Sequence, residues 1–292
     1  MPRTLEEFRV IQGRAREWTQ VLKLPFRQQR WRGHAGEFAG TGVGSSLDFQ
    51  DHRVYLPGDD PRQINWQAYA RTGTYTMKQY REEVRPLVDV ILDVSASMFA
   101  YPAKAERVFE LFAFSIESAL QSAASVRCCL VSGSVHRLLE LEALRSPDWL
   151  EMAKKMTAGV DAAELSRLPL RVGSMRLLIS DLLFPAEPER LLAPLSVRNG
   201  RGIVFAPYAH QESAPDWQGN YEFVDAETAL PHEHRVEGDV LRRYQNAYAR
   251  HFELWKNAAA KSGIALARID ADVSFLTAMR AEGIPTNAVE MG

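Results

Sequence analysis

The pattern of apolar and polar residues changes character at about residue 87. From there on, short apolar runs alternate with segments whose apolar residues recur every three or four positions. The run LVDVILDV at 87–94 is almost continuously apolar, as expected for a strand covered on both faces. Between residues 103 and 124, apolar side chains follow one broad face of a predicted helix. Strands that alternate with helices of this length indicate an α/β domain with a mostly parallel sheet.

The same pattern predicts further elements. Two strands, 126–133 and 135–142, are expected around a tight turn at 132–134, where Gly133 permits a positive φ. A long helix is expected to begin at Asp239 as its N-cap and to end at Gly263. The remaining predicted strands and helices lie at 148–168 (helix), 175–184 (strand), 188–197 (helix), 202–209 (strand), 264–270 (strand) and 273–282 (helix, capped by Asp272).

The first part of the chain has a different pattern. Residues 5–22 place apolar side chains along one stripe of a predicted helix, and basic residues outnumber acidic ones through residue 32. This basic segment is either a docking arm for an acidic surface or a solvated helix face. The glycine-rich stretch 33–48 is predicted to be a loop. It lacks the lysine of a phosphate-binding loop, so we do not assign it that function.

Composition narrows the class of protein. The 292 residues carry a net charge of −2, and 46% of them are hydrophobic, which is typical of a globular protein and gives no basic excess for nucleic acid. No stretch approaches the roughly 18–20 apolar residues of a membrane helix. Glu6, Glu7 and Arg9 interrupt any signal-peptide core. Two adjacent cysteines in an apolar run suggest core residues in a reducing compartment, so we expect a cytoplasmic protein.

Polar side chains follow two of the predicted strands at the point where each strand ends. Asp93, Ser95 and Ser97 come at alternate positions after the first strand, and Asp181 comes at the end of LLISD. Ligands collect at the carboxyl ends of strands in such sheets, so these side chains are expected at one edge. Oxygen ligands without histidine or cysteine favour a hard cation such as Mg²⁺ over zinc.

Two hydroxyls and two carboxylates would leave such a cation under-neutralised. Its vacant coordination position would attract an acidic group of a partner, and no base or nucleophile for catalysis is evident. The site would therefore serve binding. The alternative interpretation is structural, because Asp and Ser after a strand often cap the next helix or form a turn.

The stretch DVSAS, residues 93–97, resembles the D-x-S-x-S pattern of the metal-ion-dependent adhesion site in von Willebrand factor type A domains. Asp181 lies where that family's later aspartate is expected. The resemblance implies that Asp93, Ser95, Ser97 and Asp181 hold Mg²⁺ or Mn²⁺ and bind a carboxylate of a partner. The family also uses a threonine from an intermediate loop. Thr157 and Asp161 lie in that region without a clear motif, so the fifth ligand is unassigned.

Residues 48–83 resemble the signature of the bacterial family known as domain of unknown function fifty-eight, which precedes a von Willebrand type A fold. The pattern R-x-Y-x-P-G-D-D-x-R-x-I-D-W and the following A-R-T are matched except that Asn65 replaces the usual aspartate. The signature residues that we expect to matter for a partner or for the lobe are Arg53, Tyr55, Gly58, Asp59, Asp60, Arg62, Trp66 and Arg71. They form either an internal clamp, favoured because Trp66, Ile64 and Tyr55 resemble packing residues, or an exposed recognition surface.

These features together predict the organisation of the chain. We expect a basic helical segment at 1–34, a β-containing signature lobe at 35–86, a tail at 285–292, and between them a three-layer, Rossmann-like domain of the von Willebrand type A class. That domain spans 87–284, with an insertion at about 208–237. The resemblance to the signature extends to YEFVDAETA, residues 221–229, within this insertion.

The leading functional hypothesis is a non-enzymatic protein-interaction module. The family resemblance implies a partnership with a MoxR-type AAA+ ATPase in chaperone-like assembly or maturation of client proteins. The alternative is a Mg²⁺-dependent phosphohydrolase using Asp93 and Asp181, which would also need a second acid and a lysine or arginine for phosphate. RNA binding through the basic segment is a third hypothesis, but it lacks interleaved aromatic residues.

Overall fold

A computed structural model describes residues 4–26, 34–43, 49–57, 60–156 and 162–292. Contacts within the chain divide it into two compact units. The first consists of Met1–Phe26 together with Leu87–Gly292, and the second of Arg27–Pro86. The helix at the start of the chain thus belongs to the same unit as the sheet that begins at Leu87.

The first unit is built on a six-stranded sheet with the order β12-β9-β8-β5-β6-β7. Its strands are β5 (Leu87–Asp93), β6 (Ser125–Ser132), β7 (Val135–Leu139), β8 (Met175–Ile179), β9 (Arg201–Tyr208) and β12 (Ala265–Asp270). All neighbouring pairs are parallel except β6 and β7, which form the predicted hairpin. The φ of Gly133 in its turn is +53°. The predicted α/β architecture with a mostly parallel central sheet is confirmed.

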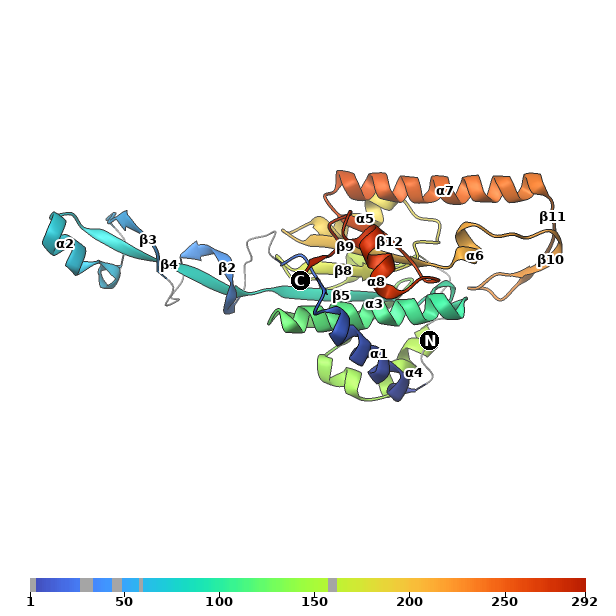
Figure 1. Cartoon of the computed structure of the whole chain (residues 1–292), viewed down its shortest axis with the longest axis horizontal. Helices are drawn as coiled ribbons and strands as arrows, with labels where there is room; N and C mark the ends of the chain where they lie inside the picture. Colours follow the sequence, from blue (N-terminus) through green and yellow to red (C-terminus); the bar gives the residue numbers. More distant parts are fainter. Residues whose placement is uncertain (1–3, 27–33, 44–48, 58–59, 157–161) are drawn as a thin grey trace. The chain divides into compact units, whose positions relative to one another are not determined.

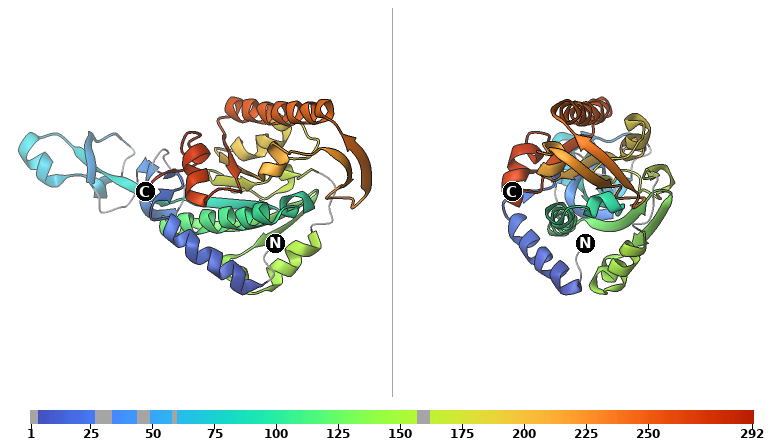
Figure 2. Two further views of the ribbon diagram at one scale, coloured as in Figure 1. Left: turned by 45° about the vertical axis from the view of Figure 1, so that its right-hand side comes forward. Right: turned by 90° about the vertical axis from the view of Figure 1, so that its right-hand side faces the viewer.

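Helices cover both faces of this sheet (Figures 1 and 2). On one face lies α3 (Pro102–Gln121), and on the other lie α5 (Pro188–Ser196) and α7 (Gly238–Lys261). Outside α3, α1 (Leu5–Trp18) and α4 (Asp148–Met156) add a further layer. The ring of Phe8 in α1 lies 6.1 Å from that of Phe109 and 4.9 Å from that of Trp149, so an apolar seam joins the three helices.

The core between the sheet and the helices α5 and α7 comes from apolar side chains of both layers. Ile91, Leu178 and Val204 point from adjacent strands toward Leu192 and Trp255 in the helices, and all five are buried. Full burial of each such side chain contributes roughly 1.5–3 kcal/mol. The continuous apolar runs of the sequence are therefore explained by strands that are covered on both faces.

Two predicted helix starts are wrong by one or two residues. Helix α7 begins at Gly238 after Glu237, and Asp239 lies in its first turn, where it forms an ion pair with Arg243. The last helical region begins with α8 (Phe275–Ala278), and Ser274 rather than Asp272 is its N-cap because the Ser274 hydroxyl accepts from the Thr277 amide. A π-helical turn, Met279–Gly283, follows it. Gly263 follows the end of α7 with φ +64°, as expected.

Shorter elements complete the unit. The strands β10 (Gly219–Val224) and β11 (Pro231–Val236) form a separate antiparallel hairpin, and β1 (Leu22–Lys23) pairs with β13 (Glu290–Met291). The remaining short helices are η3 (Ala96–Phe99), η4 (Leu141–Arg145), η5 (Leu165–Arg167) and α6 (His210–Ser213). Among the described residues, no helix combines the length and the apolar composition that crossing a membrane requires.

The second unit contains a three-stranded antiparallel sheet in the order β2-β4-β3. Its elements are β2 (His34–Val43), β3 (Phe49–Val54), η2 (Pro61–Gln63), α2 (Trp66–Thr72) and β4 (Thr76–Arg85). The loop predicted for residues 33–48 is therefore wrong for 34–43, which pair with β4. The pairing shifts register twice, between Ala35 and Phe38 and between Ala39 and Val43. Glycines, which pack poorly in strands and often mark bulges, hid this strand from the sequence pattern.

Candidate functional site at the carboxyl end of the sheet

The strands β5 and β8 lie side by side at the point where the order of the strands in the sheet reverses. The chain leaves β5 toward β6 on one side, while β8 and β9 lie on the other. Such a switch point leaves a crevice at the carboxyl ends of the strands, where ligands bind in open α/β sheets. Asp93 is the last residue of β5, and Asp181 comes two residues after β8.

The side chain of Asp93 is held at the centre of this edge. It is buried, with only 1% of its surface exposed. One carboxyl oxygen accepts the amide of Ser95 at 2.9 Å, and the other accepts the hydroxyl of Ser180 at 2.6 Å. The hydroxyl oxygens of Ser95 and Ser97 lie 3.3 Å apart. The turn into η3 therefore carries one carboxyl group and two hydroxyls.

Asp181 is fixed by both the backbone and a buried cation. Its Oδ1 accepts a hydrogen bond from the amide of Leu183 at 3.1 Å, and its Oδ2 accepts one from the Lys104 ammonium at 2.7 Å. The next residue, Leu182, has φ +58° although it is not glycine. This conformation costs roughly 1–2 kcal/mol and is retained because the Leu182 side chain is fully buried in the core.

Lys104 links two of the carboxyl groups. Its side chain is completely buried, and its Nζ lies 2.7 Å from Asp181 and 2.6 Å from Oε1 of Glu212. Glu212 comes from α6, just beyond the end of β9, and its other oxygen accepts the amide of Ala209 at 2.8 Å. Burial lowers the pKa of Lys104, but the two adjacent carboxylates more than offset this effect, so the net pKa is raised.

The pKa of Asp93 is raised to about 6. The main cause is burial, followed by the negative charge of Asp181, while the hydrogen bonds from Ser180 and Ser95 act in the opposite direction. A carboxyl group in this position is costly to ionise without a nearby positive charge. No hydrogen bond or ion pair joins Asp93 to Lys104 in the described part of the chain.

The charges in this cluster do not balance. Of the three buried carboxyl groups, Asp181 and Glu212 contact the ammonium of Lys104, whereas Asp93 has no basic partner among the described residues. Oxygen ligands with excess negative charge suit a hard divalent cation. The described residues contain no group of three or more His, Cys, Asp or Glu side chains arranged to hold a metal, so any cation here would depend on the serine hydroxyls as well. Thr157 and Asp161 lie outside the described residues.

A fourth acidic side chain reaches the rim of the cluster from the hairpin of β10 and β11. Oε1 of Glu227 accepts the amide of Ser97 at 3.0 Å, and its Oε2 accepts the amide of Ala96 at 3.2 Å. These contacts join residues that are 130 and 131 positions apart in the sequence. The edge of the sheet therefore already accommodates a carboxylate at the turn that carries the two serines.

Lys104, Glu212 and Glu227 are site residues that the sequence pattern did not reveal. Lys104 had a detectable signal, because it lies four positions before Val108 on the stripe of α3 that faces the sheet. Glu212 follows a strand end, as Asp93 does, but with a short helix between them. Glu227 lies in the stretch 221–229 to which the family resemblance extends, but that stretch does not reveal its contact, since its position depends on how the hairpin folds back.

The signature residues of the second unit lie mostly at its surface. Asp60 caps η2 by accepting the amide of Arg62, and Asn65 caps α2 by accepting the amide of Ala68 at 3.2 Å. Asn65 thus performs the capping that an aspartate would also provide. Arg62 and Arg71 are exposed, and neither guanidinium forms an ion pair with a described residue. Arg53 donates to the carbonyl oxygen of Val54, while Gly58 and Asp59 lie outside the described residues.

Trp66 is not the buried packing residue that the sequence suggests. It is 58% exposed, and its ring lies edge-on to those of Tyr69 and Tyr75 at 6.2 and 6.4 Å. Tyr69 and Tyr75 stack at 4.3 Å, and Tyr75 also meets Tyr55 at 6.3 Å. The aromatic residues pack mainly on one another, which leaves Trp66 open to solvent.

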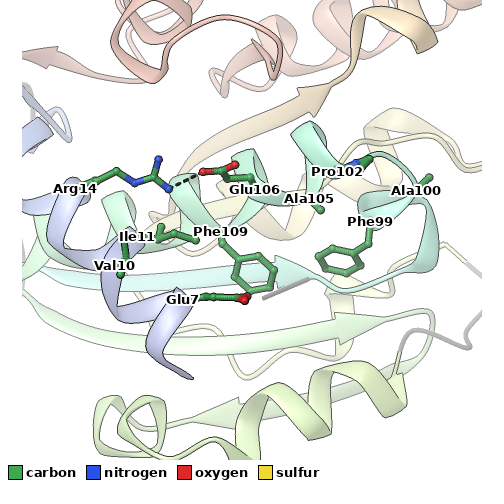
Figure 3. Close-up of a pocket in the computed structure, with 10 residues that line it drawn as sticks. All are labelled: Glu7, Val10, Ile11, Arg14, Phe99, Ala100, Pro102, Ala105, Glu106 and Phe109. Carbon is green, nitrogen blue, oxygen red and sulfur yellow. Dashed lines mark hydrogen bonds and ion pairs between the residues drawn. The ribbon is translucent and has the colours of Figure 1, made fainter. Parts of the chain in front are cut away.

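A groove of about 580 Å³ lies between α1 and α3 (Figure 3). Val10 and Ile11 line it from α1, Phe109 from α3 and Phe99 from η3, while Arg14 and Glu106 form an ion pair of 2.7 Å at its rim. None of the four predicted metal-binding side chains lines this groove. It is therefore separate from the oxygen cluster at the end of β5.

Comparisons with known proteins give one match. The family described as "Protein of unknown function DUF58" matches residues 51–253, which is more than half of the chain. The match covers most of the signature region of the second unit and five of the six strands of the sheet, and it includes Asp93, Asp181 and Glu227. No curated protein and no solved structure matches the chain.

Proposed function

The chain belongs to the family of proteins of unknown function DUF58, and we propose that it is a non-enzymatic interaction module that binds an acidic side chain of a protein partner through a divalent cation. In this proposal Asp93, Ser95, Ser97 and Asp181 hold Mg²⁺ or Mn²⁺ in the manner of a von Willebrand type A adhesion site. The partner is a MoxR-type AAA+ ATPase, or a client that the two proteins assemble or mature together.

The excess of buried carboxyl groups over Lys104 is the observation that carries this proposal. Desolvated carboxylates repel one another unless a proton or a cation neutralises them. The oxygen atoms of Asp93, Ser95 and Ser97 lie together at the switch point of the sheet, where a cation would be accessible from the loops. A cation bound there would supply positive charge, and the partner's carboxylate would complete its neutralisation.

The same residues argue against hydrolysis. A phosphohydrolase needs a cationic group that is open to the phosphate. Lys104 is the cationic side chain that contacts the cluster, and its Nζ is enclosed by Asp181 and Glu212. Mg²⁺-dependent turnover of a phosphate ester that Asp93→Asn abolishes would support the phosphohydrolase hypothesis.

A binding assay with a purified MoxR-type ATPase from the same genome tests the proposal. We expect the wild-type chain to bind in Mg²⁺ and to lose at least about tenfold in affinity in EDTA. Asp93→Asn should show the weak affinity in both buffers. Asp270→Asn is the matched control, because Asp270 ends β12 at the same edge of the sheet but lies outside the cluster. Equal affinity of Asp93→Asn and the wild type would remove the cation from the account.

A further inference from the structure

The tip of the hairpin between β10 and β11 is shaped by its own hydrogen bonds. Oδ1 of Asp225 accepts the amides of Glu227 and Thr228 at 3.0 and 2.7 Å and the hydroxyl of Thr228 at 2.8 Å. The backbone closes the turn with bonds from Ala229 to Asp225 and from Asp225 to Leu230. This local network fixes the backbone on which the Glu227 side chain is carried.

The hairpin contacts the rest of the unit through a few of its side chains. Its two strands pair only with each other among the described strands, and most of their side chains are exposed. At the base Val236 is buried, and close to the turn the ring of Phe223 lies 4.9 Å from that of Trp217, which lies 5.4 Å from the ring of Tyr244 in α7. In Figure 1, β10 and β11 lie at the end of the sheet toward which β5 runs. Beyond Phe223, the hydrogen bonds of Glu227 join the turn of the hairpin to the sheet edge.

The contact between Glu227 and the sheet edge rests on two hydrogen bonds. Two backbone amides, those of Ala96 and Ser97, donate to its carboxylate. The same turn carries Asp93, whose Oδ1 accepts the amide of Ser95. Glu227 itself is only half-buried. A contact of this kind holds in the free chain but yields to a competing ligand of similar charge.

We propose that Glu227 is an autoinhibitory residue: in the free chain its carboxylate occupies the position that an acidic side chain of the partner takes in the complex. This inference rests on the function proposed above and adds its regulation. Because Glu227 is tethered, its effective concentration at this position is on the order of millimolar. A partner's acidic side chain must compete with a local carboxylate at that concentration. A partner whose acidic side chain binds this position weakly therefore does not displace Glu227.

A purely structural role for Glu227 makes a different prediction. If Glu227 only caps η3 and holds the hairpin, its removal loosens both segments and gives no ligand any advantage. If Glu227 is a competitor, its removal exposes a position that another carboxylate can fill. Binding of an added carboxylate peptide therefore separates the two roles.

The probe is a fluorescein-labelled, disulfide-closed peptide with the sequence of residues 219–236, which carries the same glutamate. We expect the full chain with Glu227→Gln to bind it at least about tenfold more tightly than the wild type does. The matched control is Glu222→Gln, an exposed change on the same hairpin opposite Glu233, which should behave as the wild type. A second peptide, with glutamine in place of its own glutamate 227, should not bind any variant.

A second variant provides an independent test and asks whether the conformation of the turn positions Glu227. Asp225→Ala removes the acceptor that shapes the turn but leaves Glu227 in place. We expect it to bind the peptide with an affinity between those of the wild type and Glu227→Gln. Circular dichroism spectra and thermal melts confirm that each variant is folded. Equal affinities for all variants, no binding to Glu227→Gln, or equal binding of the glutamine peptide would each overturn the inference.

Repeating the titration in Mg²⁺ and in EDTA distinguishes this inference from the proposed function. If Glu227→Gln prefers the peptide equally in both buffers, the competitor role stands and the cation is removed from the proposed function. If the wild type binds Mn²⁺ but Glu227→Gln shows no preference for the peptide, the competitor role fails and the cation site stands.

Discussion

The two ends of β5 carry buried charges that are handled in opposite ways. At the amino end, Asp89 is surrounded by basic groups: its carboxylate accepts the Nε of Arg171 at 2.8 Å, the amide of Arg171 at 2.9 Å and the hydroxyl of Ser174 at 2.8 Å. Arg127 forms a further ion pair at 3.3 Å. At the carboxyl end, Lys104 pairs with two buried carboxyl groups, Asp181 and Glu212, whereas the third, Asp93, has no basic partner among the described residues.

The basic side chains of the amino-end cluster also form hydrogen bonds with the backbone. The remaining donors of Arg171 bond the carbonyl oxygens of Val88 and Ser125, and Arg176 bonds those of Pro194 and Val197. The guanidinium groups there outnumber the carboxylate of Asp89, and their remaining N–H groups donate hydrogen bonds to backbone carbonyl oxygens. Such a network closes the end of the sheet and fixes the loop after α5. It needs nothing from outside the chain.

The comparison teaches how to tell a structural charge cluster from a candidate binding site within one sheet. Both clusters are buried and both contain aspartate, so burial and residue type do not separate them. The balance of charge distinguishes the two clusters. The amino-end cluster is satisfied by its own protein groups, whereas the carboxyl-end cluster has surplus negative oxygen that a cation would neutralise.

Breaking the amino-end cluster should have the largest effect on stability. Arg171→Ala leaves Asp89 buried with a single, longer ion pair to Arg127. We expect the free energy of unfolding to fall by about 3–5 kcal/mol in urea titrations, with no change when Mg²⁺ is added. The control is Arg167→Ala, whose ion pair with Glu164 is exposed and should contribute less than about 1 kcal/mol. A small loss for Arg171→Ala, or rescue by Mg²⁺, would erase the distinction between the two ends.

A pH series should sharpen the comparison at the carboxyl end. The pKa of Asp93 is raised above its unfolded value, so the folded, metal-free chain binds the extra proton between about pH 4 and about pH 6. Stability in EDTA should therefore fall as pH rises through this window, by up to about 3 kcal/mol for this one group. Other acids titrate in the same range, so the measured quantity is the difference between the wild type and Asp93→Asn in urea titrations.

Asp93→Asn has a neutral side chain at every pH, and its stability relative to the wild type should rise across the window. Mg²⁺ should reduce that advantage above about pH 6, where the wild-type carboxylate is ionised and can bind the cation. A difference between the two proteins that stays constant with pH would mean that the charge of Asp93 is already neutralised within the chain.

The smallest effects are expected in the second unit. Arg62→Ala and Arg71→Ala remove exposed guanidinium groups that form no ion pair with a described residue. We expect each to change the free energy of unfolding by less than about 0.5 kcal/mol, measured by urea titration. Losses above about 1 kcal/mol would instead support the internal clamp. Unchanged stability leaves the exposed arginines and Trp66 as a recognition surface to be tested with partners.

The sequence predicted those parts of the molecule that depend on local pattern. Apolar runs located the strands of the sheet, and the polar residues after β5 and β8 located its carboxyl edge correctly. The strand β2 escaped because its glycines do not show the alternation of a strand, and Trp66 was misjudged because aromatic character does not reveal burial. Glu227 escaped because its contact joins residues that are 131 positions apart, and such contacts have no local signal.

Titration with Mn²⁺ by calorimetry at pH 7.5 tests the central claim most directly. The account predicts that the wild type and Asp270→Asn each bind one Mn²⁺, and that Asp93→Asn binds it at least about tenfold more weakly. Absence of Mn²⁺ binding to the wild type, or equal binding to all three proteins, would contradict the claim that surplus carboxylate at the end of β5 is a cation site.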